Sequence, residues 1–153
     1  MTAKIVEKSI NPVDNGIITS SFGSRISPVT GKREFHTGLD IGVSENSKVY
    51  ATCDGVVTDS GYSNSYGYFI RIKAGDATEF FYAHLNKLNK NKSDKVKKRE
   101  VIALSGNTGW STGPHLHYEI CKNGTLIDPM GNVEMEYTQE VVNEYKARGE
   151  VLN

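Results

Sequence analysis

Short strand-like runs dominate this sequence and restrict the folds that it can adopt. The runs are rich in β-branched and aromatic residues, and Gly, Asn, Asp and Ser separate them at hairpin spacing: GIITSSF, KVYATCDGVVTDSG, YGYFIRIKAG, EFFYAHL, EVIALSG and HLHYEI. In GYFIRIKA, residues 68, 70 and 72 fall on one face and residues 69, 71 and 73 on the other, which is the two-residue period of a strand. No helical pattern separates these runs, so they predict an all-β domain of antiparallel sheets that form a sandwich or a partly open barrel.

The end of the chain has a helical period instead. The stretch TQEVVNEYKARGEVL, residues 138–152, predicts an amphipathic helix that Gly149 weakens near its end. Its apolar stripe would consist of Val141, Val142, Tyr145 and Val151. We therefore divide the chain into an N-terminal extension (1–15), a β domain (16–130) and a C-terminal helical extension (131–153).

The composition excludes several kinds of partner. The 18 basic and 18 acidic side chains cancel, and nucleic-acid affinity needs net positive charge on some face, so we expect no nucleic-acid partner. We interpret the basic stretch KLNKNKSDKVKKR, residues 87–99, as a solvated loop, with contact to an anionic cell-wall polymer as the alternative. No apolar run has the length of a signal peptide or a transmembrane segment, so we expect neither in this chain. Cys53 and Cys121 form no CxxC motif, and we expect free thiols without excluding a disulfide.

The histidine pair in HLHYEI is the first element of a candidate metal site. Side chains at positions i and i+2 of a strand point to the same face, about 6.6 Å apart, so His115 and His117 should project together. Glu119 has the same parity, and we interpret it as a rim or structural residue. Four histidines can produce one such pair by chance, and the spacing does not decide which of the two would bind a metal ion.

His36 and Asp40, in HTGLD, form the second element. On a straight strand their Cα atoms would lie about 13 Å apart, which strains the sharing of one ion, so the chain must bend between them, and Gly38 is where it can. His84, in EFFYAHL, would by itself be read as an ordinary structural histidine. Together, however, all four histidines and one aspartate make a coherent set. Two nitrogens and one oxygen on zinc leave a position for water, as in hydrolytic sites, and two histidines remain for proton transfer.

These motifs, in this order and spacing, resemble those of the lysostaphin-type (LytM-like) zinc endopeptidases, which cut peptide cross-links in bacterial peptidoglycan. The resemblance covers residues 16–129 and rests on ITSSFGSRISPVTGKREFHTGLDIG, VYATCDGVVTDSG, YGYFIRI, FFYAHLNKL, and VIALSGNTGWSTGPHLHYEI followed by DP. It implies that residues 16–130 are a lysostaphin-like peptidase domain. Relatives usually read YGHL where this chain has YAHL, and a Gly-Gln pair or similar where it has Arg-Glu, but neither difference removes a functional group.

The resemblance also implies the residues of the site. His36, Asp40 and His117 would bind Zn²⁺, and His84 and His115 would be the catalytic pair outside the ligand set. The chain has no HExxH motif and hence no glutamate placed as general base, so proton transfer and oxyanion stabilisation would fall to that pair.

The implied substrate is the stem peptides and cross-bridges of peptidoglycan, reached at the cell wall, outside the cell, or from a virion. The loop NTGWSTGP, residues 107–114, would form a wall of the substrate groove, with Trp110 as an apolar surface. Three alternatives remain at this stage: a non-catalytic peptidoglycan-binding or hydrolase-activating module of the same fold, a D-alanyl carboxypeptidase, and a structural part of a phage tail or secretion assembly that carries the wall-cutting site. The sequence does not distinguish glycine-bridge from D-alanyl–diaminopimelate cleavage, and it does not give the oligomeric state, the source or the role of the terminal helix.

Overall fold

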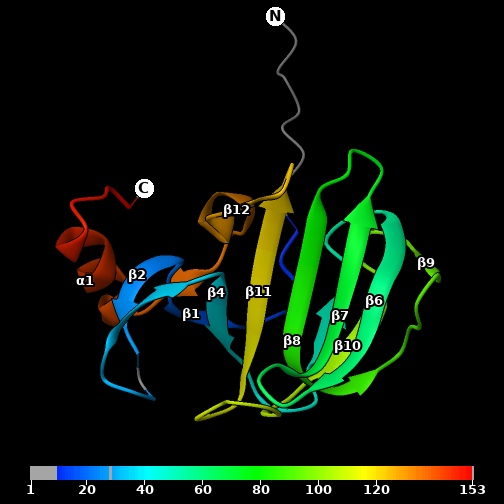
Figure 1. Ribbon diagram of the computed structural model, residues 1–153, viewed down its shortest axis with the longest axis horizontal. Helices are drawn as coiled ribbons and strands as arrows, with labels where there is room; N and C mark the ends of the chain where they lie inside the picture. Colours follow the sequence, from blue (N-terminus) through cyan, green and yellow to red (C-terminus); the bar gives the residue numbers. More distant parts are fainter. Residues whose placement is uncertain (1–9, 28, 153) are drawn as a thin grey trace, which may run out of the picture.

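The computed structural model describes residues 10–27 and 29–152, and most of its regular structure is β (Figure 1). The strands are β1 (Ile17–Ser20), β2 (Gly23–Ile26), β3 (Arg33–His36), β4 (Leu39–Gly42), β5 (Lys48–Tyr50), β6 (Gly55–Ser63), β7 (Gly67–Ala74), β8 (Glu79–Leu88), β9 (Lys95–Val96), β10 (Val101–Ser105), β11 (His115–Lys122), β12 (Thr125–Ile127) and β13 (Glu136–Tyr137). The helices are the short 3₁₀ helix η1 (Pro129–Asn132) and α1 (Gln139–Ala147).

One large sheet organises the described part of the chain. It contains eleven strands, of which eight follow the order β13-β1-β4-β11-β8-β7-β6-β9. β10 pairs with both β5 and β8, β12 pairs with β11, and β2 and β3 form a separate hairpin. The pairings are antiparallel except for β1 with β13, and the sheet does not close on itself. The prediction of an all-β, antiparallel, partly open fold with a C-terminal helix is therefore confirmed.

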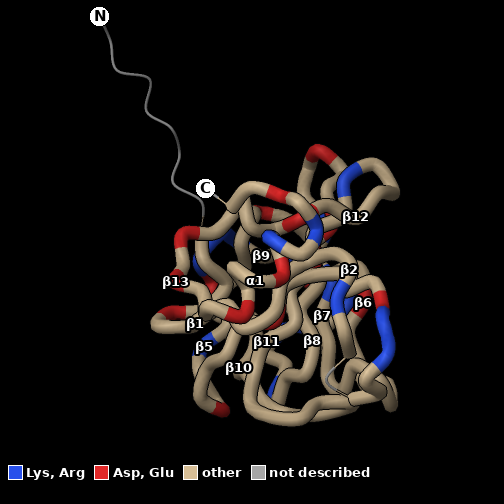
Figure 2. The backbone as a smooth tube through the Cα atoms, turned by 90° about the vertical axis from the view of Figure 1, so that its left-hand side faces the viewer, with Lys and Arg blue, Asp and Glu red and all other residues tan. Residues whose placement is uncertain are grey.

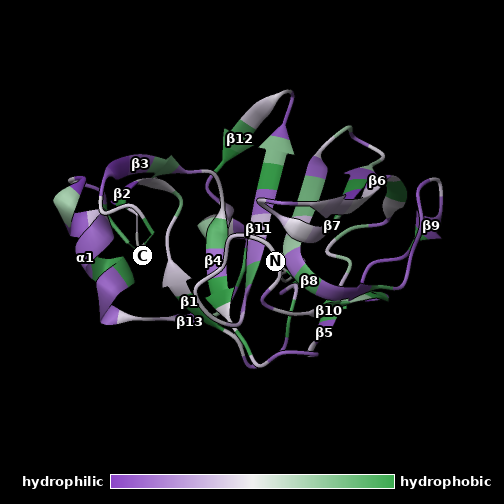
Figure 3. Cartoon of the chain, turned by 60° about the horizontal axis from the view of Figure 1, so that its bottom comes forward, coloured by the Kyte–Doolittle hydropathy of each residue, from purple (hydrophilic) through white to green (hydrophobic). Residues whose placement is uncertain are grey.

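Apolar side chains of the central strands form the core. Ile70 and Ile72 of β7 are completely buried, as the two-residue period predicts, whereas Tyr68 at the start of the same face is 41% exposed. β4, β11 and β8 are neighbours in the sheet and carry many of its hydrophobic residues (Figure 3). The candidate site lies on these three strands and on the end of β3.

Helix α1 is present but shorter than the sequence predicts. Thr138 caps its N-terminus and Val141 and Tyr145 are buried, in agreement with the predicted stripe. The predicted continuation to residue 152 is wrong, because Gly149 takes a φ of +70° and the Glu150 N–H donates to the Tyr145 carbonyl, which is the hydrogen bond that ends a helix. Val151 consequently lies outside the stripe and is 80% exposed.

Both flanks of the predicted β domain contact it. Residues 1–9, most of the predicted N-terminal extension, lie outside the described residues, but Val13 is completely buried in the core. At the other end, β13 pairs with β1, and α1 packs beside β1. The boundaries at residues 15 and 130 stay predictions.

Figure 2 marks the basic and acidic residues along the backbone, and residues of both signs occur in several parts of the described chain. The basic stretch 87–99 is less loop-like than predicted, because it contains the end of β8 and all of β9, with Val96 buried. Cys53 and Cys121 are free thiols, as expected. Within the described ranges, no helix has the length and apolar character needed to cross a membrane.

Candidate metal centre

A break between two strands positions His36 and Asp40. His36 is the last residue of β3 and Asp40 is the second residue of β4, and these strands belong to different sheets, so the bend predicted at Gly38 is present. A Cβ atom at Gly38 would lie 2.3 Å from the carbonyl oxygen of Tyr118. Only glycine therefore allows the chain to turn this close to β11.

The pairing of β4 with β11 brings the histidine pair to the same place. His117 lies directly opposite Asp40 in the antiparallel register, and His115 lies opposite Gly42. The two imidazoles share a face, as predicted, since His117 Nδ1 and His115 Nε2 lie 3.1 Å and 3.6 Å from the same Asp40 Oδ1 atom.

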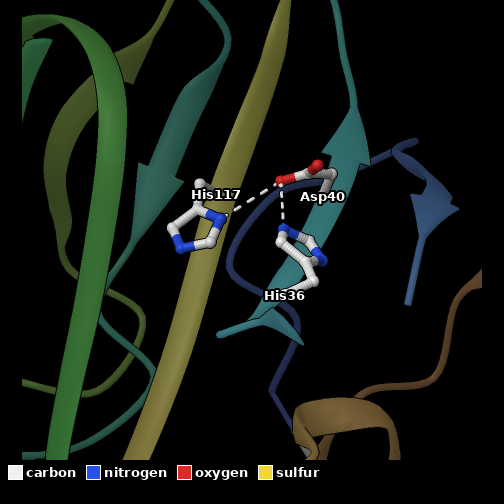
Figure 4. A group of neighbouring side chains, drawn as sticks. All are labelled: His36, Asp40 and His117. Carbon is white, nitrogen blue, oxygen red and sulfur yellow. Dashed lines mark hydrogen bonds and ion pairs between the residues drawn. The ribbon is translucent and has the colours of Figure 1, made fainter. Parts of the chain in front are cut away.

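His36, Asp40 and His117 form a compact cluster (Figure 4). One nitrogen or oxygen of each lies within 4.8 Å of those of the other two, and His36 Nε2 is 3.2 Å from Asp40 Oδ1. Burial by itself would raise the pKa of Asp40, but hydrogen bonds from His117 and His36, and their charge, hold it well below the usual range. The carboxylate is therefore ionised at neutral pH.

Outer hydrogen bonds orient the two imidazoles of this cluster. The Nδ1–H of His36 donates to the Ser21 carbonyl at 2.8 Å, and the Nε2–H of His117 donates to Glu119 Oε2 at 2.8 Å. Burial lowers the pKa of His117, but hydrogen bonds to Asp40 and Glu119 outweigh it and raise the pKa to about 9. In each ring the nitrogen that faces Asp40 is left to bind a proton or a metal ion.

Two further residues complete the surroundings of the cluster. Glu119 is buried and also accepts a hydrogen bond from Thr37 Oγ1, so of the two roles predicted for it, rim or structural residue, the structure bears out the structural one. Arg25 Nη1 lies 3.2 Å from Asp40 Oδ2, the oxygen that faces away from the histidines. Arg25 could not be predicted from the sequence, because nothing local in SFGSRIS indicates that the β2–β3 hairpin folds over β4.

His84 lies inside β8, four residues before its end. The pairing of β8 with β7 shifts register around it, and its φ is +62°, in the left-handed region. Its Nδ1–H donates to the Thr108 carbonyl at 2.6 Å, which leaves Nε2 without the proton. Burial, aided by the nearby charges of His115 and His117, lowers the pKa of His84 to about 4, so the ring is neutral at neutral pH.

His115 stands between His84 and a groove. The centroids of the His84 and His115 rings are 4.8 Å apart, and His115 Nδ1 lies 2.8 Å from the Gly113 carbonyl oxygen, to which its N–H donates. A groove of about 330 Å³ opens beside His115 and Asp40, with Thr112, Gly113 and Pro114 in its lining. The end of the loop 107–114 therefore contributes a wall, as expected, while Trp110 is 74% exposed.

The cluster fits a zinc-like divalent ion. Two imidazole nitrogens and a carboxylate oxygen are a donor set of hydrolytic zinc sites. The two separations of 3.1 Å and 3.2 Å from Asp40 Oδ1 are close to the edge of a tetrahedron with zinc–ligand bonds of about 2 Å, which is roughly 3.3 Å. The second nitrogen of each imidazole also donates a hydrogen bond to an oxygen, of Ser21 for His36 and of Glu119 for His117, which is typical of metal-binding histidines.

The chain is similar to known proteins both in sequence and in fold. DD-carboxypeptidase/endopeptidase Mpg of Neisseria meningitidis serogroup B is 38% identical over 122 residues, which are 80% of this chain and 28% of Mpg. Peptidoglycan DD-endopeptidase ShyA of Vibrio cholerae is 38% identical over 127 residues, which are 81% of this chain and 30% of ShyA. The chain thus spans less than a third of the length of these curated relatives.

Two solved structures have the same architecture. A zinc-containing peptidase from Vibrio cholerae superposes with a TM-score of 0.73 at 35% identity, over 81% of this chain and 39% of that one. The catalytic domain of lysostaphin from Staphylococcus simulans superposes with a TM-score of 0.70 at 31% identity, over 77% of this chain and 92% of that domain. Residues 34–129, more than half of the chain and the segment that holds all four histidines and Asp40, match peptidase family M23. The chain therefore belongs to peptidase family M23.

Proposed function

We propose that this chain is a zinc metalloendopeptidase that hydrolyses the peptide cross-links of bacterial peptidoglycan. The observation that carries the proposal is the cluster of His36, Asp40 and His117 within 4.8 Å, with two more histidines beside it. Family membership supports peptide hydrolysis, and the names of ShyA and Mpg support peptidoglycan as the substrate.

In this proposal His36, Asp40 and His117 would hold the zinc ion through the ligand atoms that face one another. Zinc, when bound, polarises the scissile carbonyl and lowers the pKa of a water molecule. Ser21 and Glu119 keep the two imidazoles in the required tautomers, and Arg25 holds the second oxygen of Asp40. The buried, hydrogen-bonded setting keeps these atoms in place before substrate arrives.

His84 and His115 move the protons. Both rings donate from Nδ1 to a backbone carbonyl, so each offers Nε2 as a base. When water adds to the scissile carbonyl, one of these nitrogens takes its proton, and the imidazolium stabilises the developing oxyanion. The same proton then passes to the amine nitrogen as the carbon–nitrogen bond breaks. The charge on each histidine is restored at the end of the cycle.

The groove beside His115 and Asp40 is the proposed binding site for a stem peptide or cross-bridge. The site of action would be the cell wall or the periplasm, reached either by secretion or from a virion. We propose residues 16–130 as the peptidase domain, in keeping with the family match over residues 34–129.

The experiment is digestion of purified peptidoglycan, before and after removal of metal with a chelator and after return of zinc. Turnover should disappear with the metal and return with zinc. His117→Ala should lose both zinc and turnover, whereas His115→Ala should keep zinc and lose turnover. Turnover that survives complete removal of zinc, or that both variants retain, contradicts the proposal.

The same digests identify the bond that is cut. An endopeptidase converts cross-linked dimers of stem peptides to monomers, whereas a carboxypeptidase releases free D-alanine. Mpg is named for both activities, so mass spectrometry of the products from peptidoglycans with different cross-links would assign this chain to one activity or to both.

A further inference from the structure

Helix α1 lies outside the segment that matches the family, yet it reaches the metal cluster through one residue. Figure 1 shows α1 beside β2, at the edge of the fold where β1 leads into β2. Ser21 occupies that junction and is completely buried. Its carbonyl oxygen accepts the hydrogen bond from His36 Nδ1, so its position decides how the His36 ring is held.

Two side chains hold Ser21: Glu144 from α1, and Arg148, which is the C-terminal cap of this helix. Glu144 Oε1 accepts hydrogen bonds from the Ser21 N–H at 2.9 Å and from the Ser21 hydroxyl at 3.0 Å. Arg148 Nη2 donates to the Ser21 hydroxyl at 3.0 Å, and its Nη1 donates to the Ser24 carbonyl at 3.0 Å. Every polar group of Ser21 is therefore engaged, either by α1 or by His36.

The helix is itself fixed to the core, so these contacts are not those of a loose tail. Val141 is completely buried and Tyr145 is nearly so. The Tyr145 hydroxyl donates to Asp128 Oδ2, and the Thr138 N–H donates to the Ile18 carbonyl. Glu144 and Arg148 are four residues apart, so they leave the helix on the same face, toward Ser21.

We propose that α1 is a working part of the metal centre, in which Glu144 and Arg148 are positioning residues that act on His36 through Ser21. The inference rests on the proposed function, because it requires His36 to bind zinc. Without these contacts the Ser21 carbonyl is free to shift, and the His36 ring loses the hydrogen bond that sets its tautomer and direction. The affinity for zinc then falls although no ligand has changed.

The test is the dissociation constant for zinc, measured on the purified full chain by competition with a chromophoric chelator. Glu144→Ala should weaken zinc binding about tenfold, the lower end of the effect of outer hydrogen-bond partners of metal ligands. Glu144→Gln, which keeps an oxygen that can accept from Ser21, should restore most of the affinity. Glu140→Ala is the matched control: it removes the same charge from the same helix, but Glu140 has no hydrogen bond to Ser21, and zinc affinity should stay at the wild-type value.

Thermal unfolding of the metal-free proteins separates positioning from simple support of the fold. A structural role alone would lower the melting temperature of Glu144→Ala and leave its zinc affinity unchanged, and that result overturns the inference. If Glu144→Ala does not fold, Arg148→Ala takes its place, with the same expected loss of affinity. If the wild-type chain binds no zinc, both the proposed function and this inference fail. If His36→Ala loses zinc but Glu144→Ala and Arg148→Ala bind it as the wild type does, only this inference fails.

Discussion

At the scale of single residues, the site depends on carboxylates that do not touch the reacting atoms. Glu119 lies next to His117 Nε2 and receives a second hydrogen bond from Thr37. Burial would raise the pKa of Glu119, but the His117 and Thr37 hydrogen bonds lower it, so the carboxylate is ionised and accepts both. The strand period predicts which face Glu119 occupies, but not that Thr37 closes over it, because Thr37 comes from a segment 82 residues away.

Removal of this carboxylate should weaken metal binding although no proposed ligand is substituted. Glu119→Ala leaves the Nε2–H of His117 without its partner, and zinc affinity should fall about 10- to 100-fold. Glu119→Gln keeps an acceptor oxygen and should lose less. Titration with a competing chelator measures both variants, and an alanine variant with wild-type affinity would show that His117 needs no outer support.

At the scale of elements, three segments fix the position of His84: β8, the turn before β7 and the loop that precedes β11. The His84 N–H donates to the Tyr66 carbonyl, and its ring donates to Thr108 in the loop that precedes β11. This loop can approach β7 because Gly67 has no side chain: a Cβ there would lie 2.1 Å from Thr108 Oγ1. The direction of His84 is therefore set by the Gly67–Thr108 contact.

Gly67→Ala should reduce turnover while zinc binding persists. The added methyl group displaces Thr108, and Gly67 has a φ of +63°, at which alanine costs about 1–2 kcal/mol. A displacement of His84 by about 1 Å should lower kcat up to 100-fold. Gly75→Ala is the control, because a Cβ at Gly75 meets nothing within 4 Å. Steady-state kinetics and zinc analysis of both variants test this, and equal kcat values for the two would contradict it.

The sequence predicts the elements unevenly, for identifiable physical reasons. Runs such as GYFIRIKA predict β7 because their period matches burial on one side. β9 and β13 have only two residues each, too few for any period, and pairing with distant strands creates them. The bulge at His84 also has no local signal, since no glycine stands at the position with positive φ.

At the scale of the whole molecule, the cluster is assembled from distant parts of the chain. The motifs and the family resemblance identify His36, Asp40 and His117 as a set, and the bend at Gly38 follows from the reach of their side chains. The contact of α1 with Ser21 could not be predicted in this way, because it joins residues 123 positions apart and depends on where the tail packs. The candidate ligands can thus be predicted from motifs, whereas the groups that orient them depend on the tertiary fold.

With zinc bound as proposed, the cluster should also couple the stability of the whole chain to pH and to zinc. The pKa of His117 is about 9 in the folded, metal-free protein, whereas an unfolded histidine has a pKa of about 6.5. The folded state therefore holds an extra proton between these values. This contribution to stability is complete below about pH 6.5 and is lost as the pH rises through 9. Zinc on His117 Nδ1 takes the place of that proton, so the loss should vanish in the zinc-loaded protein.

Unfolding of the metal-free and the zinc-loaded chain, followed from pH 6.5 to 9 at buffered free zinc, should reveal this coupling. The melting temperature of the metal-free protein should fall across this range, that of the zinc-loaded protein should change less, and the difference between the two should widen with pH. About one proton should be released for each zinc ion bound near pH 7.5, which calorimetry in buffers of different ionisation enthalpy can count. In His117→Ala the fall with pH should be absent, because the proton that produces it has no site. Parallel pH profiles for the metal-free and zinc-loaded wild type would mean that zinc does not compete with a proton at His117.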